Sequence, residues 1–144
     1  MKALDTNILV YALAANSKHH ADAYKLLTEF AQGPTAWAIP WPCIYELLRV
    51  ITHPRIYRPP LLPDLALEQV KAIIASPSLA LLSETTRHAD VLEMVMRQSG
   101  VSGNLIHDAH IVSLCIEHGV TELITNDHDF ARFSGVRIVN PFAP

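Results

Sequence analysis

Short apolar runs alternate along this chain with longer segments that have the periodicity of amphipathic helices. The runs cover residues 2–4, 36–40, 78–82, 123–125 and 136–139 and are predicted strands, and helices are expected over residues 7–15, 18–32, 43–52, 65–75, 86–98 and 104–118. Asp64 and Asn104 are expected to cap the fourth and sixth helices, and Gly119 to end the sixth. Alternating strands and helices favour an α/β fold, here a mainly parallel central sheet of about five strands flanked by helices as an α/β/α sandwich.

Length and composition fit a single folded domain over residues 1–144. Half of the 144 residues are hydrophobic and only 5 are glycine, so the chain can bury a sizeable core. The net charge of −3 indicates no overall basic surface, and binding to nucleic acid would need a local patch or a metal. Cys43 and Cys115 both lie on apolar helix stripes and predict buried free thiols, which suits a reducing cytoplasm. No segment is long enough to span a membrane, and the apolar run over residues 8–15 is not interpreted as a signal peptide.

Two aspartates follow directly on predicted strands. Asp5 ends the apolar opening of the chain, and Asp127 follows the strand at 123–125 after a single Asn126. Because the carboxyl ends of parallel strands meet at one edge of a sheet, and ligands bind beyond that edge, we expect Asp5 and Asp127 to lie close together.

Two further acids lie on the apolar stripes of predicted helices. Glu46 shares a stripe with Cys43 and Leu47, and Asp108 shares one with Ile111. An ionised carboxylate on a buried face costs several kcal/mol unless it is paired or bound to a metal. Either acid alone could lie at a helix edge and reach solvent or a nearby arginine. Four acids that converge on one edge of the sheet favour a bound cation instead.

The four carboxylates therefore predict a divalent metal site. Two carboxylates 4 Å apart repel by about 4 kcal/mol at an effective dielectric constant near 20, so a cluster must take up protons or a cation. Oxygen ligands without nitrogen or sulfur select Mg²⁺ or Mn²⁺ over Zn²⁺. Such an ion lowers the pKa of a bound water, orients it and neutralises charge on a phosphate. Metal-assisted hydrolysis of a phosphodiester is the reaction that this site predicts.

The ordered set of motifs resembles the signature of PIN-domain ribonucleases, and above all the VapC-type toxins of bacterial toxin–antitoxin pairs. The resemblance covers the whole chain, and the set is specific although each short motif is weak alone. The motifs are Asp5-Thr6-Asn7, Glu46 within Tyr-Glu-Leu, Asp108 within His-Asp-Ala, and Thr125-Asn126-Asp127-His128-Asp129-Phe130.

The resemblance implies a PIN-like fold and a role for each matching residue. It implies a catalytic quartet of acids, two of which are direct ligands of Mg²⁺ (or Mn²⁺). Three neighbouring polar residues would orient the carboxylates. Asp129 would be an outer-shell helper or a cap of the local turn. The quartet is Asp5, Glu46, Asp108 and Asp127, the metal ligands are Asp5 and Asp108, and the orienting residues are Thr6, Asn7 and Thr125. An RNA substrate, a cognate VapB-like antitoxin and a homodimer in the cytoplasm, away from membranes, are also implied.

Other readings of the same residues fit less well. His107 and His110 are neighbours on a predicted helix with His118 two turns beyond, but a zinc site needs three or four converging ligands. We expect His107 and His110 to face solvent or to contact RNA. Position 7 is Asn, which argues against an aspartyl nucleophile, and the absence of lysine after Lys71 argues against a phospho-accepting receiver. The alternative from another class is a catalytically weak or inactive PIN-like module that binds RNA or protein.

Overall fold

The computed structural model describes residues 1–143, and its strands form one parallel sheet. The strands are β1 (Lys2–Leu4), β2 (Trp37–Pro40), β3 (Leu79–Leu82), β4 (Glu122–Ile124) and β5 (Arg137–Val139). Their order is β3-β2-β1-β4-β5, and every neighbouring pair is parallel. The predicted five-stranded parallel sheet is confirmed, and each strand begins and ends within one residue of its expected bounds.

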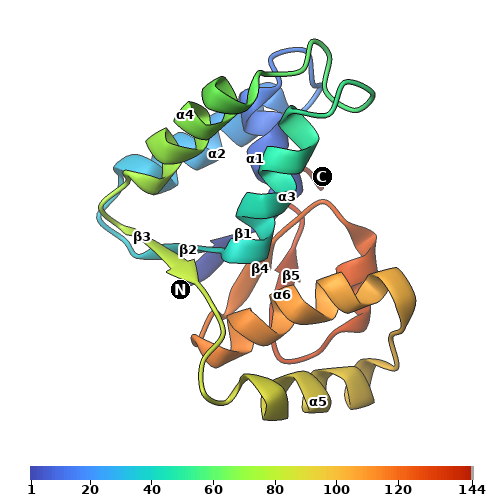
Figure 1. Ribbon diagram of the computed structural model, residues 1–144. Coiled ribbons are helices and arrows are strands. Elements are labelled where there is room, and N and C mark those ends of the chain that lie inside the picture. The colour runs from blue at the N-terminus through green and yellow to red at the C-terminus, as the bar shows by residue number, and fades with distance from the viewer. Residues whose placement is uncertain (144) are drawn as a thin grey trace.

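The described residues form six α-helices in two groups. Figure 1 shows α1 to α4 gathered in one group and α5 packed beside α6 in the other, with the strands between them. Two short 3-10 turns, at Gly103–Leu105 and His128–Arg132, precede α6 and follow β4. The helices are α1 (Thr6–Leu13), α2 (His20–Gln32), α3 (Trp41–Ile51), α4 (Pro63–Ile74), α5 (His88–Ser99) and α6 (Ile106–Glu117).

The helix ends show where local sequence signals were correct and where they were not. Gly119 has a φ of 71° just beyond the end of α6, a conformation that glycine adopts at no steric cost, so this stop signal is confirmed. Asp64 is not the cap of α4, because Pro63 already occupies the first helical position and moves the start of the helix forward. Asn104 is not a cap either, since it lies inside the turn Gly103–Leu105, which leads directly into α6.

The core lies on both faces of the sheet. Leu4, Trp37, Ile39 and Leu123 are fully buried, as expected for strands that helices cover on both sides. The two cysteines are free and buried, as predicted. Within residues 1–143, no helix combines the length and the hydropathy needed to cross a bilayer.

The strand order brings the ends of β1 and β4 together. The chain moves outward from β1 to β2 and β3, and it returns to the other side of β1 with β4 and β5. Leu4, the last residue of β1, pairs with Ile124, the last residue of β4. The strand order reverses at this point, so the residues that follow the two strands border the crevice in which open α/β sheets bind ligands.

Candidate active site

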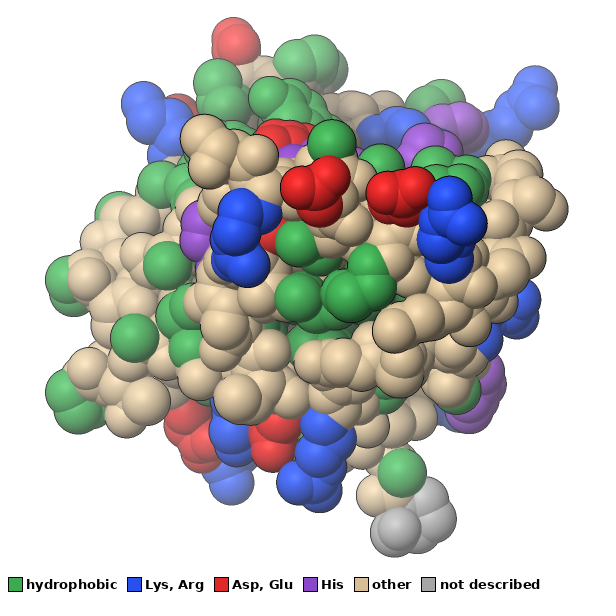
Figure 2. Space-filling model, turned by 90° about the horizontal axis from the view of Figure 1, so that it is seen from below, with side chains coloured by type: hydrophobic (Ala, Val, Ile, Leu, Met, Phe, Trp, Pro, Cys, Tyr) green, Lys and Arg blue, Asp and Glu red, His purple; other side chains and the backbone are tan. Residues whose placement is uncertain are grey.

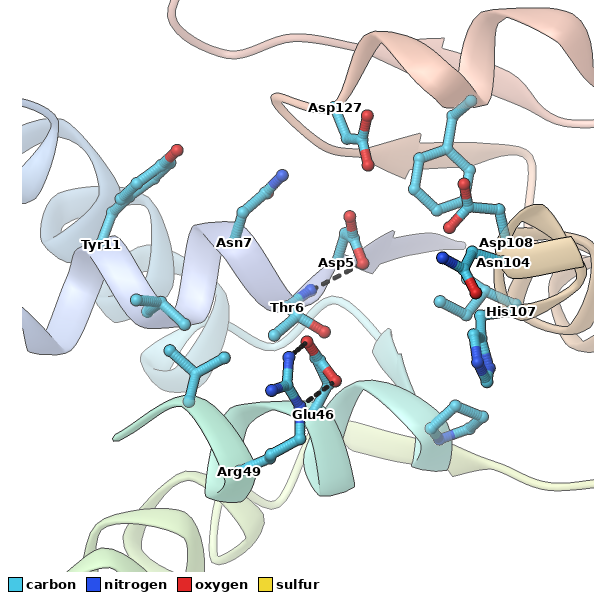
Figure 3. Close-up of a pocket in the computed structure, with 15 residues that line it drawn as sticks. Asp5, Thr6, Asn7, Tyr11, Glu46, Arg49, Asn104, His107, Asp108 and Asp127 are labelled. Carbon is cyan, nitrogen blue, oxygen red and sulfur yellow. Dashed lines mark hydrogen bonds and ion pairs between the residues drawn. The ribbon is translucent and has the colours of Figure 1, made fainter. Parts of the chain in front are cut away.

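The pocket at this edge of the sheet contains the four acids singled out in the sequence. Asp5 and Asp127 come from the ends of β1 and β4, Glu46 from α3 and Asp108 from α6, and all four line one cavity of about 650 Å³. In Figure 3, Asp5 lies between Asp127 and Asp108 on one side and Glu46 on the other. The expected meeting of strand-end acids and helical acids is therefore observed.

Asp5 is held rigidly in the floor of the pocket. It is only 5% exposed, and its Oδ1 accepts a hydrogen bond of 2.7 Å from the backbone N–H of Thr6, which makes Asp5 the N-cap of α1. The Thr125 hydroxyl donates to Asp5 Oδ2 at 2.7 Å, and the Cys43 thiol lies 3.5 Å from Oδ1. Burial raises the pKa of Asp5 above its ordinary value, although the bonds from Thr125 and Thr6 act in the opposite direction.

Thr125 connects the two strand-end acids. Besides donating to Asp5, its hydroxyl accepts hydrogen bonds from the backbone N–H of Asp127 at 3.0 Å and from Asn7 Nδ2 at 3.3 Å. Thr125 is 1% exposed, so water cannot readily replace these partners. The Thr6 hydroxyl instead donates to a backbone carbonyl of α3 at 3.4 Å, and only the backbone of Thr6 contacts a carboxylate. Of the three residues expected to orient the carboxylates, only Thr125 donates a side-chain hydrogen bond to one; Asn7 contacts Thr125 and acts at most through it, and the side chain of Thr6 contacts no carboxylate.

The pKa of the Asp108 carboxyl group is strongly raised. Desolvation, and then the charges of Asp127, Asp5 and Asp129, raise its pKa to about 6. Asp108, Asp127 and Asp129 offer oxygen atoms that all lie within 4.8 Å of one another. This set is all oxygen and carries repelling charges, so it fits a hard divalent cation such as Mg²⁺.

Asp129 belongs to this cluster more closely than the sequence suggested. Its backbone N–H donates to Asp127 Oδ1 at 2.9 Å, so Asp127, and not Asp129, caps the turn at His128–Arg132. The carboxylate of Asp129 is therefore not used as a cap and belongs to the cluster, although Arg132 lies 3.4 Å from its Oδ1.

Glu46 differs from the expectation of a buried charge. Its side chain is 44% exposed, and Arg49, one turn further along α3, forms a bidentate pair with it through distances of 3.1 and 2.6 Å. Figure 3 shows the two side chains joined at the mouth of the pocket. The hydrogen bonds from Arg49 lower the pKa of Glu46. A position at the edge of the apolar stripe explains this arrangement, because an edge residue reaches both the pocket and an exposed arginine.

Two further residues of the pocket were not identified in the sequence for this role. Asn104 and Tyr11 line the cavity with the acids. Asn104 was interpreted as a helix cap, but it precedes Asp108 by four positions, and this spacing could have placed both on one side of the helix. Tyr11 gave no signal, because an aromatic residue in a helix is ordinarily part of the core.

A second, shallower cavity of about 530 Å³ continues from the first. It shares the walls formed by Glu46, Arg49 and His107, and it adds Trp41 and Tyr45 from α3. The rings of Trp41 and Tyr45 are 6.0 Å apart, and Tyr45 is 67% exposed. The crevice thus leads from an acidic centre to an aromatic surface.

Basic side chains do not gather into an extended surface on the face shown in Figure 2. On that face, lysine and arginine side chains are scattered among acidic ones around a small hydrophobic area. This agrees with the net charge of −3, and any recognition of an anionic polymer would depend on local groups.

Comparison with known proteins agrees with the fold and the motifs. A family model described as PIN domain matches residues 2–136. Ribonuclease VapC37 of Mycobacterium tuberculosis is 34% identical over 141 residues, which cover 98% of this chain and 97% of that protein. Ribonuclease VapC48 of the same species is 34% identical over 139 residues, 96% of each chain.

Solved structures show the same fold. The crystal structure of VapBC2 from Rickettsia felis bound to a promoter DNA fragment gives a TM-score of 0.69 at 22% identity, covering 96% of this chain and 97% of that one. VapC20 of Mycobacterium tuberculosis, described as a sarcin–ricin loop cleaving toxin, gives a TM-score of 0.66 at 18% identity, covering 95% and 99%. The ordered acids, the parallel sheet and these similarities lead to one assignment: the chain belongs to the PIN domain family, in the branch that contains the VapC proteins.

Proposed function

We propose that this protein is a Mg²⁺- or Mn²⁺-dependent endoribonuclease that hydrolyses RNA phosphodiester bonds and acts as the toxin of a type II toxin–antitoxin pair. The observation that carries the proposal is the convergence of Asp5, Glu46, Asp108 and Asp127 on one pocket. The relatives named ribonuclease VapC37 and VapC48, which align over nearly the whole chain, support RNA as the substrate.

The acidic side chains would hold the ion in a defined arrangement. Asp5 and Asp108 are the proposed direct ligands, and Asp127 and Asp129 complete the oxygen cluster around Asp108. When bound, the ion makes a water molecule more acidic and neutralises charge on a phosphate. Thr125 fixes the orientation of Asp5. Because the pKa of Asp108 is raised to about 6, its carboxyl group holds a proton below that pH in the absence of a cation.

The second cavity supplies groups suited to RNA next to the acids. The exposed Tyr45 and the half-buried Trp41 offer aromatic surface on which an unpaired base can stack. Arg49 lines both cavities and can exchange its contact with Glu46 for one with a phosphate. Recognition of this kind uses single-stranded or looped RNA, whose bases are free to leave their stack.

The alternative of a non-catalytic module is not favoured. A degenerate fold that only binds RNA has no need of four converging carboxylates, and each adds repulsion that must be offset. All four are present, and the Thr125 hydroxyl donates to the Asp5 carboxylate and accepts from the backbone N–H of Asp127.

An RNA cleavage assay tests the proposal. Purified wild type, Asp108→Asn and the control Asp22→Asn, an exposed position in α2, are incubated with a structured RNA in Mg²⁺, Mn²⁺ or EDTA. Wild type and control are expected to cleave with either metal and not in EDTA, and Asp108→Asn is expected to lose most of its activity. Glu46→Gln and Asp127→Asn should lose activity less completely. Cleavage by Asp108→Asn at near the wild-type rate would show that the site is assigned wrongly.

A toxin that cleaves cellular RNA must be restrained, and the acidic pocket suits a cationic inhibitor. We propose that a cognate VapB-like antitoxin places an arginine among the acids, where guanidinium hydrogen bonds replace the charge of the metal. Its remaining contacts would lie along α3, the 53–63 loop and α4, where Ile56, Leu62, Leu65 and Leu67 are 48–70% exposed. The structure of a related VapBC pair supports a partner of this class. We also propose that the toxin is a homodimer that works in the cytoplasm.

Co-expression tests the antitoxin separately from the nuclease. The open reading frame immediately upstream is cloned together with this chain, and the purified product is tested for a stable complex and for RNA cleavage. A complex without activity is the expected result. A complex that still cleaves RNA at the full rate would contradict the arginine plug and leave the nuclease proposal intact.

A further inference from the structure

A second group of side chains with metal-ligand chemistry lies where the loop after β3, α5 and α6 meet, and it contains none of the four acids. Glu84 in the loop after β3, His88 at the start of α5 and His110 on α6 offer ligand atoms that all lie within 4.8 Å of one another. The rings of His88 and His110 are 5.4 Å apart and nearly perpendicular. The sequence argued against a zinc site formed by His107, His110 and His118, and it predicted that His110 would face solvent or RNA; in the structure His110 contacts Glu84 and His88.

The histidine at the start of α5 is oriented by a buried acid. Glu117 has no exposed side-chain surface, and its Oε2 lies 2.6 Å from His88 Nδ1. Its Oε1 accepts hydrogen bonds from the backbone N–H and the hydroxyl of Thr85 at 3.0 and 2.8 Å. A buried carboxylate that accepts from Nδ1 leaves the lone pair of His88 on Nε2. Histidine ligands of zinc are held in this way, with the second ring nitrogen bonded to a carboxylate.

The histidine on α6 contacts the remaining member of the cluster directly. His110 Nε2 lies 2.7 Å from Glu84 Oε1. In a tetrahedral zinc site with bonds of 2.0–2.2 Å, two ligand atoms are about 3.4 Å apart. Because Glu84 is exposed and sits in a loop, a small rotation of its side chain can open this contact to the spacing that a shared ion requires.

We propose that Glu84, His88 and His110 bind a Zn²⁺ ion at a site separate from the acidic quartet. Two imidazole nitrogens and one carboxylate oxygen are a ligand set for zinc, whereas the oxygen-only quartet suits Mg²⁺. Glu84 and His110 also line the second cavity, beside Trp41 and Tyr45. A fourth coordination position therefore faces this cavity and is available to water or to a donor atom of a partner.

The ion would add a link between two parts of the chain that already pack together and share hydrogen bonds. It ties the loop between β3 and α5 to α6, and α6 also carries Asp108, two residues before His110. Binding of zinc therefore stabilises the wall of the crevice next to the active site. The proposal does not depend on the nuclease function, because its ligands are different residues.

Metal retention tests the site without an activity measurement. The untagged full-length chain is stripped with a chelator, loaded with Zn²⁺, dialysed and analysed for bound metal. All chains carry Asp108→Asn, which weakens the acidic site. Asp108→Asn alone is compared with the double variants that add His110→Gln or His88→Gln. His53→Gln, which lies outside both clusters, is the matched control. Thermal melting in EDTA verifies that each variant is folded.

We expect about one zinc per chain in the Asp108→Asn background and in the His53→Gln control, and a loss of that zinc in both cluster variants. Zinc should raise the melting temperature only where it is retained. Substitution by Co²⁺ should give the intense visible absorption of a tetrahedral nitrogen-containing site, which an octahedral oxygen site lacks. Equal retention in His110→Gln and its background, or no retention in any chain, would show that the cluster is held by hydrogen bonds alone.

Discussion

Neutralising Asp108 should stabilise the metal-free protein, because its ionised carboxylate is partly desolvated and is also repelled by its acidic neighbours. The pKa of Asp108 is raised from 3.8 to about 6 by burial and then by Asp127, Asp5 and Asp129. Two pKa units correspond to about 3 kcal/mol, and since the carboxyl group is partly exposed, solvent screening reduces this to about 1.5 kcal/mol. In a chain of this length, Asp108→Asn should therefore raise the melting temperature in EDTA at pH 8 by about 3 to 5 °C.

The sign of this effect determines how it depends on pH. A raised pKa means that the folded state holds the proton more tightly than the unfolded state, so ionisation destabilises the fold. The penalty is absent well below pH 3.8, grows as the pH rises toward 6, and is complete above pH 6. The advantage of Asp108→Asn should therefore fall to about a third at pH 4.5.

Thermal unfolding in EDTA at pH 8 and pH 4.5 measures the difference between wild type and Asp108→Asn. Asp22→Asn is the control, because it removes an acid from the first turn of α2 and should lower stability slightly. Added Mg²⁺ or Mn²⁺ should then stabilise the wild type more than Asp108→Asn. A variant that melts at or below the wild-type temperature in EDTA at pH 8 would refute the electrostatic reasoning.

Three further predictions concern side-chain hydrogen bonds, two at the crevice and one away from it. Thr125→Val removes the donor to Asp5 and should cost about 1–3 kcal/mol in the free energy of unfolding, measured by urea titration. Arg49→Ala should change that free energy by less than about 1 kcal/mol, because its pair with Glu46 is exposed, yet it should lower the Mn²⁺ concentration needed for half-maximal cleavage. Tyr57→Phe loses a 3.0 Å bond to the last residue of α1 and should cost about 1 kcal/mol in urea, with no change in cleavage.

The sheet could be predicted because the sequence pattern of its strands agrees with their environment in the fold. Continuous apolar runs followed by polar residues mark strands that are buried on both faces, and parallel order follows from the helices between them. Asp5 and Asp127 could be placed together for the same reason, since parallel strands end at a common edge. The starts of α4 and α6 differ from their expected positions because Pro63 and the turn at Gly103–Leu105 displaced the expected caps.

The features of the site that the sequence did not predict depend on contacts between distant segments or on solvent exposure. The periodicity of apolar residues along the chain contains neither. Glu46 was correctly placed at the pocket, but its exposure depends on how α3 packs against its neighbours. Its pair with Arg49 is local to α3 and was among the alternatives that the sequence left open. The meeting of His88 with His110 joins residues 22 positions apart on two helices, and no local pattern links them.

The double role of Asp5 has a genetic consequence. Its carboxylate both lines the acidic pocket and caps α1 at a buried junction, whereas Asp108 is half-buried and caps nothing. Among mutants selected for survival, Asp5→Ala should therefore be recovered as an unstable chain that proteases remove. On the proposed function, Asp108→Ala should accumulate as a folded and inactive protein that still binds the antitoxin through α3, the 53–63 loop and α4. A cell that also carries the intact chain would then be sensitised by Asp108→Ala and not by Asp5→Ala.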